Sequence, residues 1–419
     1  MSKIISIKAA EIIDSRGEPT IEVSCELENA ISGRASVPSG RSAGVHEACE
    51  LRDHDEGRYN GLGVLKAIDN VNTEIYGHIK GKEFNQSALD QSLIKLDGTE
   101  NKSRLGANAI LGVSLAFARA CAAEKKIELY EYLGNLAGNK IFNLPQPMLN
   151  IINGGEHADS GLDLQEFMLA PVGLDSFARK IEAAAEIIYS LKKILQTKGY
   201  AVSVGDEGGF APKLTSNEEA FELIRQAIAD SGYSFDQVKI GIDAAASSFY
   251  KNGIYELKIS GVEEKNTNKK MIDWYEKLVD IYPIVFIEDP LAEDDWQGFT
   301  EMTERMGKKI KIVGDDLTVT NIERIKTAVE KKSVNSILIK LNQIGTLSET
   351  IEAIQLTKKQ GWLPFISHRS GETTDTFIAD LAVGLGCDWI KAGSLARGER
   401  VCKYDRLMEI GNIISRNSL

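Results

Sequence analysis

The stretch Ile284-Val285-Phe286-Ile287-Glu288-Asp289-Pro290 is a short apolar run that ends in two acids and a proline. Its length and β-branched composition favour a buried strand, and the acids mark the point where that strand ends. The same pattern returns in three further places, where the polar residues that end the apolar runs are Asp243, Asp315 and Lys340. The later runs follow one another at spacings close to one strand and one helix, so the sequence predicts alternating strands and helices.

Nine short apolar runs in the second part of the chain are strand candidates. They are residues 148–152, 165–170, 200–204, 239–243, 284–288, 310–314, 336–340, 363–367 and 389–391. Repeated strand–helix units of this number are typical of a (β/α)₈-type, TIM-like barrel. In such a barrel the residues at the C-terminal strand ends converge on one mouth, where the active site lies.

The first part of the chain has a different pattern. Residues 5–9 and 20–27 alternate with period two, which predicts antiparallel strands, and residues 62–132 follow with helical periodicity. Residues 133–147 are rich in Gly, Asn and Pro and predict a linker. We therefore expect an α/β protein with a small α+β N-terminal capping domain over 1–132 and a barrel over 140–419.

The barrel mouth is expected to hold three acids and several cations. Asp243, Glu288 and Asp315 are hard oxygen ligands that suit Mg²⁺ with open positions for water or substrate. Lys340 and Lys391 end two later strands. Positive neighbours depress the pKa of a lysine, so we expect Lys340 beside a divalent cation to act as a general base. The alternative for Lys391 is an amine that only binds phosphate.

Further polar residues stand at other strand ends. Arg369 with Ser370 forms a phosphate clamp, and His368 either donates to the same oxyanion or is a packed core histidine. Glu207, in a glycine-rich segment, is a candidate general acid if it lies opposite Lys340. The alternative is that this glycine-rich segment is only a turn. His157 stands in another glycine-flanked loop, and a single loop histidine does not by itself indicate a catalytic role.

Composition and charge exclude several classes of function. The 419 residues are 43% hydrophobic and 26% charged, and 49 Lys+Arg against 61 Asp+Glu give a net charge of −12. A broad nucleic-acid or anionic-membrane surface needs a basic face, which this balance argues against, whereas a local cationic pocket is compatible with it. Five widely spaced cysteines without C-x-x-C argue against a disulfide framework. With neither a signal-peptide pattern nor a run of about 18 apolar residues, the expectation is a cytoplasmic protein without a membrane span.

Several longer segments together closely resemble enolase (phosphopyruvate hydratase, 2-phosphoglycerate dehydratase) of the bacterial type, and the resemblance covers essentially the whole chain. The segments that carry it are Asp14-Ser15-Arg16-Gly17, Ser39-Gly40, Gly154-Gly155-Glu156-His157-Ala158, Gln165-Glu166-Phe167-Met168, Gly205-Asp206-Glu207-Gly208-Gly209, Ile287-Glu288-Asp289-Pro290, residues 315–321, residues 340–349 and residues 367–373. The last three are long and specific to the family.

The resemblance implies a glycolytic and gluconeogenic hydro-lyase that reversibly dehydrates 2-phospho-D-glycerate to phosphoenolpyruvate with two Mg²⁺ ions. One ion is implied on Asp243, Glu288 and Asp315, and a second is implied to be reached by Ser39. Lys340 is then the base that takes the C2 proton, and Glu207 assists the loss of the C3 hydroxyl, with Glu166 and His157 nearby. The implied substrate-binding residues are Gln165, Lys340, His368, Arg369, Ser370 and Lys391. The family also implies a homodimer or homo-octamer.

Three positions depart from the usual family pattern: Arg41, Glu18 and Ala392. Arg41 would place a further cation near the second metal site, and the alternative is that it points to solvent. Two other functions stay open beside the glycolytic one. The first is a paralogue that acts on a related phospho- or phosphono-acid. The second is an additional scaffold role, in an RNA-processing assembly or as a surface receptor.

Overall fold

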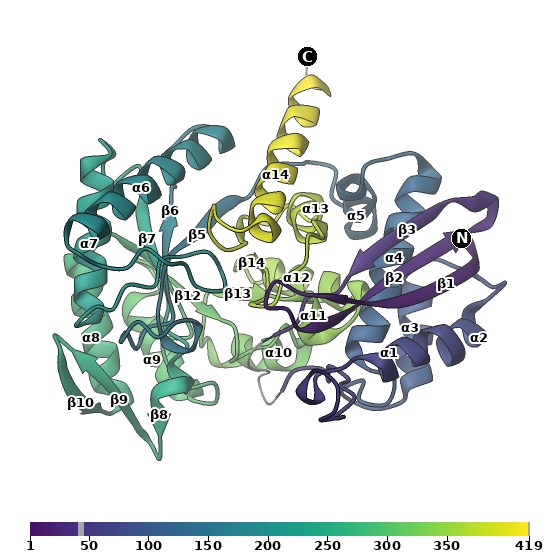
Figure 1. Cartoon of the computed structure of the whole chain (residues 1–419), viewed down its shortest axis with the longest axis horizontal. Coiled ribbons are helices and arrows are strands. Elements are labelled where there is room, and N and C mark those ends of the chain that lie inside the picture. The colour runs from purple at the N-terminus through teal and green to yellow at the C-terminus, as the bar shows by residue number, and fades with distance from the viewer. Residues whose placement is uncertain (41–45, 418–419) are drawn as a thin grey trace.

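The N-terminal module is an antiparallel sheet in the order β3-β2-β1-β4 with helices packed on it (Figure 1). The computed structural model describes residues 1–40 and 46–417. The strands of the module are β1 (Ser2–Ile13), β2 (Pro19–Leu27), β3 (Ser32–Ser36) and β4 (Glu83–Phe84). Its helices are α1 (Leu65–Asn70), α2 (Tyr76–Ile79), α3 (Gln86–Asp97), α4 (Ala107–Lys125) and α5 (Leu129–Ala137), with a π-helical turn (Val71–Ile75) between α1 and α2.

Helix α4 packs closely on this sheet because its residues are small. A Cβ added to Gly112 would lie only 2.5 Å from Cγ2 of Val23 in β2. The expected α+β module is therefore confirmed, and α5 extends into the first part of the segment that the sequence predicts as a linker.

The rest of the chain forms a closed eight-stranded barrel, as predicted, in the order β11-β12-β13-β14-β15-β5-β6-β7. Its strands are β5 (Gln146–Asn153), β6 (Glu166–Ala170), β7 (Lys239–Asp243), β11 (Ile284–Glu288), β12 (Lys311–Gly314), β13 (Ser336–Ile339), β14 (Leu363–Ser367) and β15 (Trp389–Lys391). Its helices are α6 (Phe177–Thr197), α7 (Asn217–Asp230), α8 (Asn268–Ile281), α9 (Trp296–Met306), α10 (Ile322–Lys331), α11 (Leu341–Ile344), α12 (Leu347–Lys359), α13 (Phe377–Gly384) and α14 (Gly398–Asn417). A small sheet of β8 (Tyr250–Lys251), β9 (Ile254–Ile259) and β10 (Val262–Asn266) lies outside the barrel.

Strand β6 runs antiparallel to both of its neighbours, which corrects the expectation of a regular strand–helix repeat. A parallel return needs a crossover, and the chain between β5 and β6 has only a 3-10 turn (Gly155–His157). Two packed helices, α6 and α7, then connect β6 to β7, so the chain comes back to the end at which β6 finished. The loop between α6 and α7 consequently lies at the mouth of the barrel.

The predicted strand over 200–204 is not formed. In this segment only Val204 takes part in an isolated bridge, with Phe210. The other eight candidates already close the barrel, and a closed barrel offers no free strand edge to a ninth. The apolar side chains of Tyr200 and Val202 pack against the core from a loop instead.

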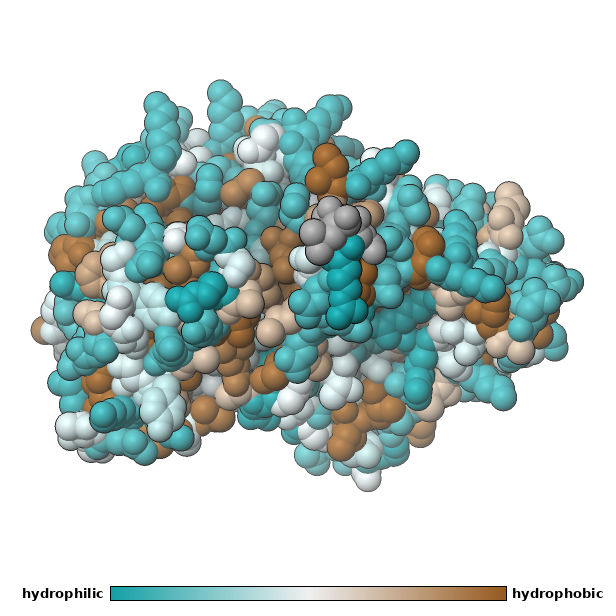
Figure 2. Space-filling view, turned by 90° about the horizontal axis from the view of Figure 1, so that it is seen from above, coloured by the Kyte–Doolittle hydropathy of each residue, from teal (hydrophilic) through white to brown (hydrophobic). Residues whose placement is uncertain are grey.

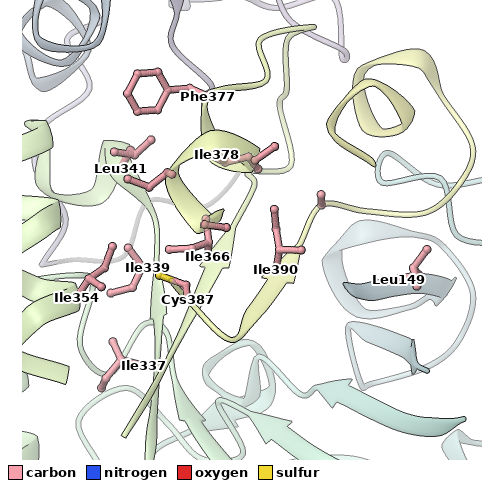
Figure 3. Close-up of a cluster of buried hydrophobic side chains, with 14 of the residues drawn as sticks. Leu149, Ile337, Ile339, Leu341, Ile354, Ile366, Phe377, Ile378, Cys387 and Ile390 are labelled. Carbon is pink, nitrogen blue, oxygen red and sulfur yellow. The ribbon is translucent and has the colours of Figure 1, made fainter. Parts of the chain in front are cut away.

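Two apolar layers lie on the two sides of the barrel wall. The inner layer is formed by Met148, Met168, Ala170, Phe286, Val313, Leu338, Phe365 and Trp389. The outer layer contains their alternate neighbours, such as Ile337, Ile339 and Ile366, which pack against the surrounding helices (Figure 3). This alternation is the period of two that a strand imposes on its side chains.

The outer surface is mainly hydrophilic, with apolar residues scattered in small groups on the face that Figure 2 shows. Among the helices of residues 1–40 and 46–417, none is long and apolar enough to cross a membrane.

Candidate active site

A layer of polar side chains lies directly above the inner apolar layer of the barrel. Side chains two residues apart on a strand point to the same face, so each inner apolar residue fixes the direction of the residue two positions nearer the mouth. These pairs are Met148 with Asn150, Phe286 with Glu288, Val313 with Asp315, Leu338 with Lys340, Trp389 with Lys391 and, on the reversed strand β6, Met168 with Glu166. Four of these polar residues, Glu166, Asp315, Lys340 and Lys391, line a cavity of about 250 Å³ at the mouth.

The ammonium group of Lys391 lies among three of the acids. Its Nζ is 3.1 Å from Oδ2 of Asp243, 2.9 Å from each carboxylate oxygen of Glu288 and 3.1 Å from Oε1 of Glu166. Burial lowers the pKa of Lys391, but the carboxylates outweigh it and raise the pKa well above its usual range. Burial and Asp243 in turn raise the pKa of Glu288 well above its usual range. One ammonium facing three carboxylates leaves this cluster short of positive charge.

Lys340 and Asp315 form an ion pair at the ends of β13 and β12. The other oxygen of Asp315 accepts a hydrogen bond of 2.9 Å from Nε2 of Gln343. Burial lowers the pKa of Lys340, but Asp315 more than offsets it, and the pKa is raised. This holds for Lys340 beside Asp315 alone, and the depressed pKa expected beside a divalent cation stays a prediction.

Glu166, Glu207 and two histidines form a second group in the cavity. His157 Nδ1 is 3.6 Å from Oε1 of Glu166 and 3.7 Å from Oε1 of Glu207. On the other side, Nε2 of His368 is 3.4 Å from Oε2 of Glu207, which also accepts a hydrogen bond of 3.1 Å from Asn150 Nδ2. Burial and the nearby Glu207 raise the pKa of Glu166 well above its usual range, whereas for Glu207 burial is outweighed by His368 and His157, which lower its pKa well below its usual range. Of the two carboxyls, Glu166 therefore holds a proton more readily.

Arg369 marks the cationic end of the cavity. Its Nη1 donates to Oε2 of Glu47 and to Oδ1 of Asn342, both at 2.9 Å, and its Nη2 donates to Oε1 of Glu47 at 3.2 Å. This pairing fixes the guanidinium plane. Ser370 follows at the rim, where its hydroxyl accepts from Arg16 Nη1 at 3.3 Å. Glu47 and Asn342 thus orient the arginine that the sequence assigns to phosphate.

Two family models match almost the entire chain. Residues 4–133 match the model described as enolase, N-terminal domain, and residues 141–419 match the model described as enolase, C-terminal TIM barrel domain. This chain belongs to the enolase family. It is thus an enolase-type hydro-lyase, and the polar layer at its barrel mouth lies where TIM-barrel enzymes carry their chemistry.

The cavity of this enolase brings together most of the residues predicted from the sequence. Those that line it are His157, Gln165, Glu166, Glu207, Asp243, Asp315, Lys340, His368, Arg369, Ser370 and Lys391. Glu288 lies beneath the lining, fully buried and bonded to Lys391. Gln165 and Glu166 reach the cavity from the N-terminal end of β6, rather than from a C-terminal strand end, because β6 is reversed.

Ser39 does not line the cavity. Its hydroxyl accepts from Arg16 Nη2 at 2.7 Å and from Arg52 Nη2 at 3.2 Å, and its backbone pairs with Gly371. Of the departures from the family pattern, Arg41 lies outside the described residues. Glu18 pairs with Arg16 at 2.8 Å, and Ala392 is fully buried.

The acids of the cavity fit a divalent metal ion. Members of this family depend on a metal, and carboxylate oxygens suit Mg²⁺. Ligand atoms of Asp289, Asp315 and Asp316 lie within 4.8 Å of one another, as do those of His157, Glu166 and Glu207. Oε2 of Glu166 is buried without a hydrogen-bond partner. The predicted set of Asp243, Glu288 and Asp315 occupies the ends of the adjacent strands β7, β11 and β12, with Lys391 bonded to the first two.

Several residues of the site were not found from the sequence. Asp289 and Asp316 stand beside predicted ligands, and burial followed by Asp315 raises the pKa of Asp316 to about 7. Asn150 could have been found, because it lies two residues after Met148 in a buried strand. No local pattern marks Glu47 or Arg400, which reach the site from distant segments.

Proposed function

We propose that this enolase interconverts 2-phospho-D-glycerate and phosphoenolpyruvate. The observation that carries the proposal is the placement of an amine and an acid pair across one cavity. In the closed strand order, β13, which ends at Lys340, is four strands away from β6, which begins at Glu166. A base and an acid on opposite sides of a substrate suit anti elimination of a proton and a hydroxyl.

Lys340 is the proposed base for the proton at C2. To accept a proton its amine must be neutral, and the ion pair with Asp315 opposes this in the metal-free protein. The residues that would hold a first Mg²⁺ are Asp243, Glu288 and Asp315. Ser39, which the resemblance assigns to a second ion, is bonded to Arg16 and Arg52 and would have to leave them to reach it. When bound, the ions supply positive charge that stabilises the negative charge developing on the substrate carboxylate. Asp315 then has a partner other than Lys340, which favours the neutral amine.

Glu207 is the proposed acid at the C3 hydroxyl. Its Oε2 faces His368 and Asn150, while its Oε1 faces His157 and shares that neighbour with Glu166. Within this pair Glu166 holds the proton more readily than Glu207, so Glu207 must take up a proton through His157 before it can donate one to the leaving hydroxyl. His157, whose pKa is lowered by burial, can relay a proton between them as a neutral imidazole.

The proposed substrate-binding residues complete the cavity. Arg369 and Ser370 would bind the phosphate, since a guanidinium pairs with two phosphate oxygens. Gln165, His368 and Lys391 would contact the remaining polar groups of the substrate. Acids outnumber cations in the lining of this cavity, so an anionic substrate would depend on the positive charge of the metal ions as well as on Lys340, Arg369 and Lys391.

The test is formation of phosphoenolpyruvate, followed by its ultraviolet absorbance, from 2-phosphoglycerate with Mg²⁺ and with EDTA. We expect turnover that requires the metal, and a loss of about 10³-fold or more in kcat for Lys340→Ala, the range of a positioned general base. Lys265→Ala, on an exposed strand outside the barrel, is the matched control. Near-normal turnover by Lys340→Ala would overturn the assignment of the base, and no turnover by the unmodified enzyme would overturn the substrate.

A further inference from the structure

Arg400 is a fully buried arginine whose guanidinium reaches into the loops around the cavity. It is placed by the first turn of α14. Its Nη1 lies 2.6 Å from Nδ1 of His368 and donates to the carbonyl of Arg369 at 2.7 Å. Its Nη2 donates to the carbonyls of Ser370 at 2.6 Å and Asp206 at 3.0 Å. One side chain therefore binds the segment before Glu207 and the segment after β14.

The contact with His368 determines which ring nitrogen carries the proton. A guanidinium has only donors, so the nitrogen that faces it must offer a lone pair. In a neutral imidazole the proton then resides on the other nitrogen, Nε2, which faces Oε2 of Glu207 at 3.4 Å. Burial lowers the pKa of His368 to about 4, so the ring is neutral at pH 7.

The backbone leaves room for this arrangement at one glycine. Gly393 has a φ of +77°, and a Cβ built there would lie 2.8 Å from Cδ of Arg400 and 2.8 Å from the carbonyl oxygen of Glu207. A side chain at residue 393 would push the arginine and the Glu207 backbone apart. The packing thus keeps Arg400, His368 and Glu207 in one row.

We propose that Arg400 is a positioning residue that fixes His368 in the Nε2–H tautomer and so aims this N–H at Glu207. The inference rests on the proposed function, in which Glu207 is the acid. Oε2 of Glu207 accepts a hydrogen bond from Asn150 and faces Nε2 of His368 at 3.4 Å, which leaves Oε1 towards His157 and the cavity. Arg400 acts on the reaction only through this orientation and does not touch the cavity itself.

The test reads the tautomer directly, by ¹⁵N NMR of the enzyme labelled selectively at its five histidines. The spectrum of His368→Gln identifies the His368 resonances by their absence. In the unmodified enzyme at pH 7 we expect a protonated Nε2 and an unprotonated Nδ1 for this ring. A protonated Nδ1 would overturn the proposal without any arginine variant.

Two variants and a matched control extend the test. Arg400→Met keeps the aliphatic stem but removes the donors, so His368 should exchange between tautomers and kcat should fall about tenfold or more, with a smaller change in KM. Arg400→Lys keeps one donor nitrogen and should restore part of the tautomer preference of His368 and part of kcat. Lys403→Met removes another buried cation of α14. Lys403 bonds to the carbonyls of Thr373 and Glu399 and pairs with Glu372 but does not contact His368, so the tautomer should not change in the folded variant.

The outcomes separate this inference from the proposed function. Retention of the Nε2–H tautomer in folded Arg400→Lys and Arg400→Met would overturn the role of Arg400. If Arg400→Met does not fold, the spectrum of the unmodified enzyme decides the question, because a protonated Nδ1 of His368 would overturn the proposal. An enzyme that shows the tautomer dependence but does not turn over 2-phosphoglycerate would retain Arg400 as the positioning residue and refute the substrate instead.

Discussion

Substitution of Gly241 by alanine should disturb the barrel core directly beneath the acids of the active site. A Cβ at residue 241 would lie 1.9 Å from Cζ and 2.0 Å from Cε1 of Phe286. The phenyl ring cannot easily move, because it packs edge-on against Phe365 at 5.7 Å and Trp389 at 5.9 Å, and those two rings stack on each other at 5.1 Å. The strands must shift instead.

The expected cost is at the upper end for overpacking, about 3 kcal/mol. For a barrel that spans residues 141–419, this corresponds to a thermal midpoint about 5 °C lower. Activity should fall as well, because Gly241 pairs with Phe286 and, two residues on, Asp243 pairs with Glu288. A shift between β7 and β11 therefore moves two proposed metal ligands relative to each other.

A double-mutant cycle measured by thermal unfolding tests the reasoning. Phe286→Leu alone should cost about 1–2 kcal/mol through the space it leaves. The double variant should be about 2 kcal/mol more stable than the sum of the single effects, because the smaller side chain removes the clash. Gly77→Ala, at a helical site with nothing within 4 Å of the added Cβ, should cost nothing and serves as the control. Additive effects of the two core substitutions would refute the account.

Two further predictions concern pH and metal. Burial raises the pKa of Glu372, but Lys403 at 2.8 Å outweighs it and the net pKa is lowered. This pair therefore stabilises the fold above the unfolded pKa of about 4.3, and its contribution is lost as pH falls below that value. Between pH 6 and pH 3 the thermal midpoint of Glu372→Gln should consequently fall less than that of the unmodified enzyme. Mg²⁺ at a hundred times its Kd should raise the unfolding free energy by about 2.7 kcal/mol. EDTA or the substitution Asp243→Asn should abolish this gain. An equal gain in Asp243→Asn would argue against Asp243 as a ligand.

The sequence by itself determined the architecture and most of the candidate residues. Short apolar runs that end in Asp243, Glu288, Asp315 and Lys340 predict barrel strands, because a buried strand is apolar along its length and carries charge only at its ends. Period-two alternation also fixes the direction of each of these side chains. The residues of the polar layer on these strands can therefore be predicted from each strand's own sequence.

Other features depended on segments far apart in the chain. The reversal of β6 brings Glu166 to the mouth, and it follows from a connection without a crossover helix. The strand predicted at 200–204 is absent because the other strands close the barrel without it. The direction of β6 and the absence of a strand at 200–204 cannot be predicted from those residues alone, since both depend on how all the strands close the barrel.

Only the tertiary structure decided the electrostatics of the site. From the sequence, Lys340 was expected to lie beside a divalent cation, and the fold adds Asp315 as its ion-pair partner. Lys391 likewise lies between Asp243 and Glu288, and Arg400 reaches His368 from the C-terminal helix. A pKa or a tautomer depends on burial and on the partner a few ångströms away, and those partners come from strands and helices that the local pattern does not relate.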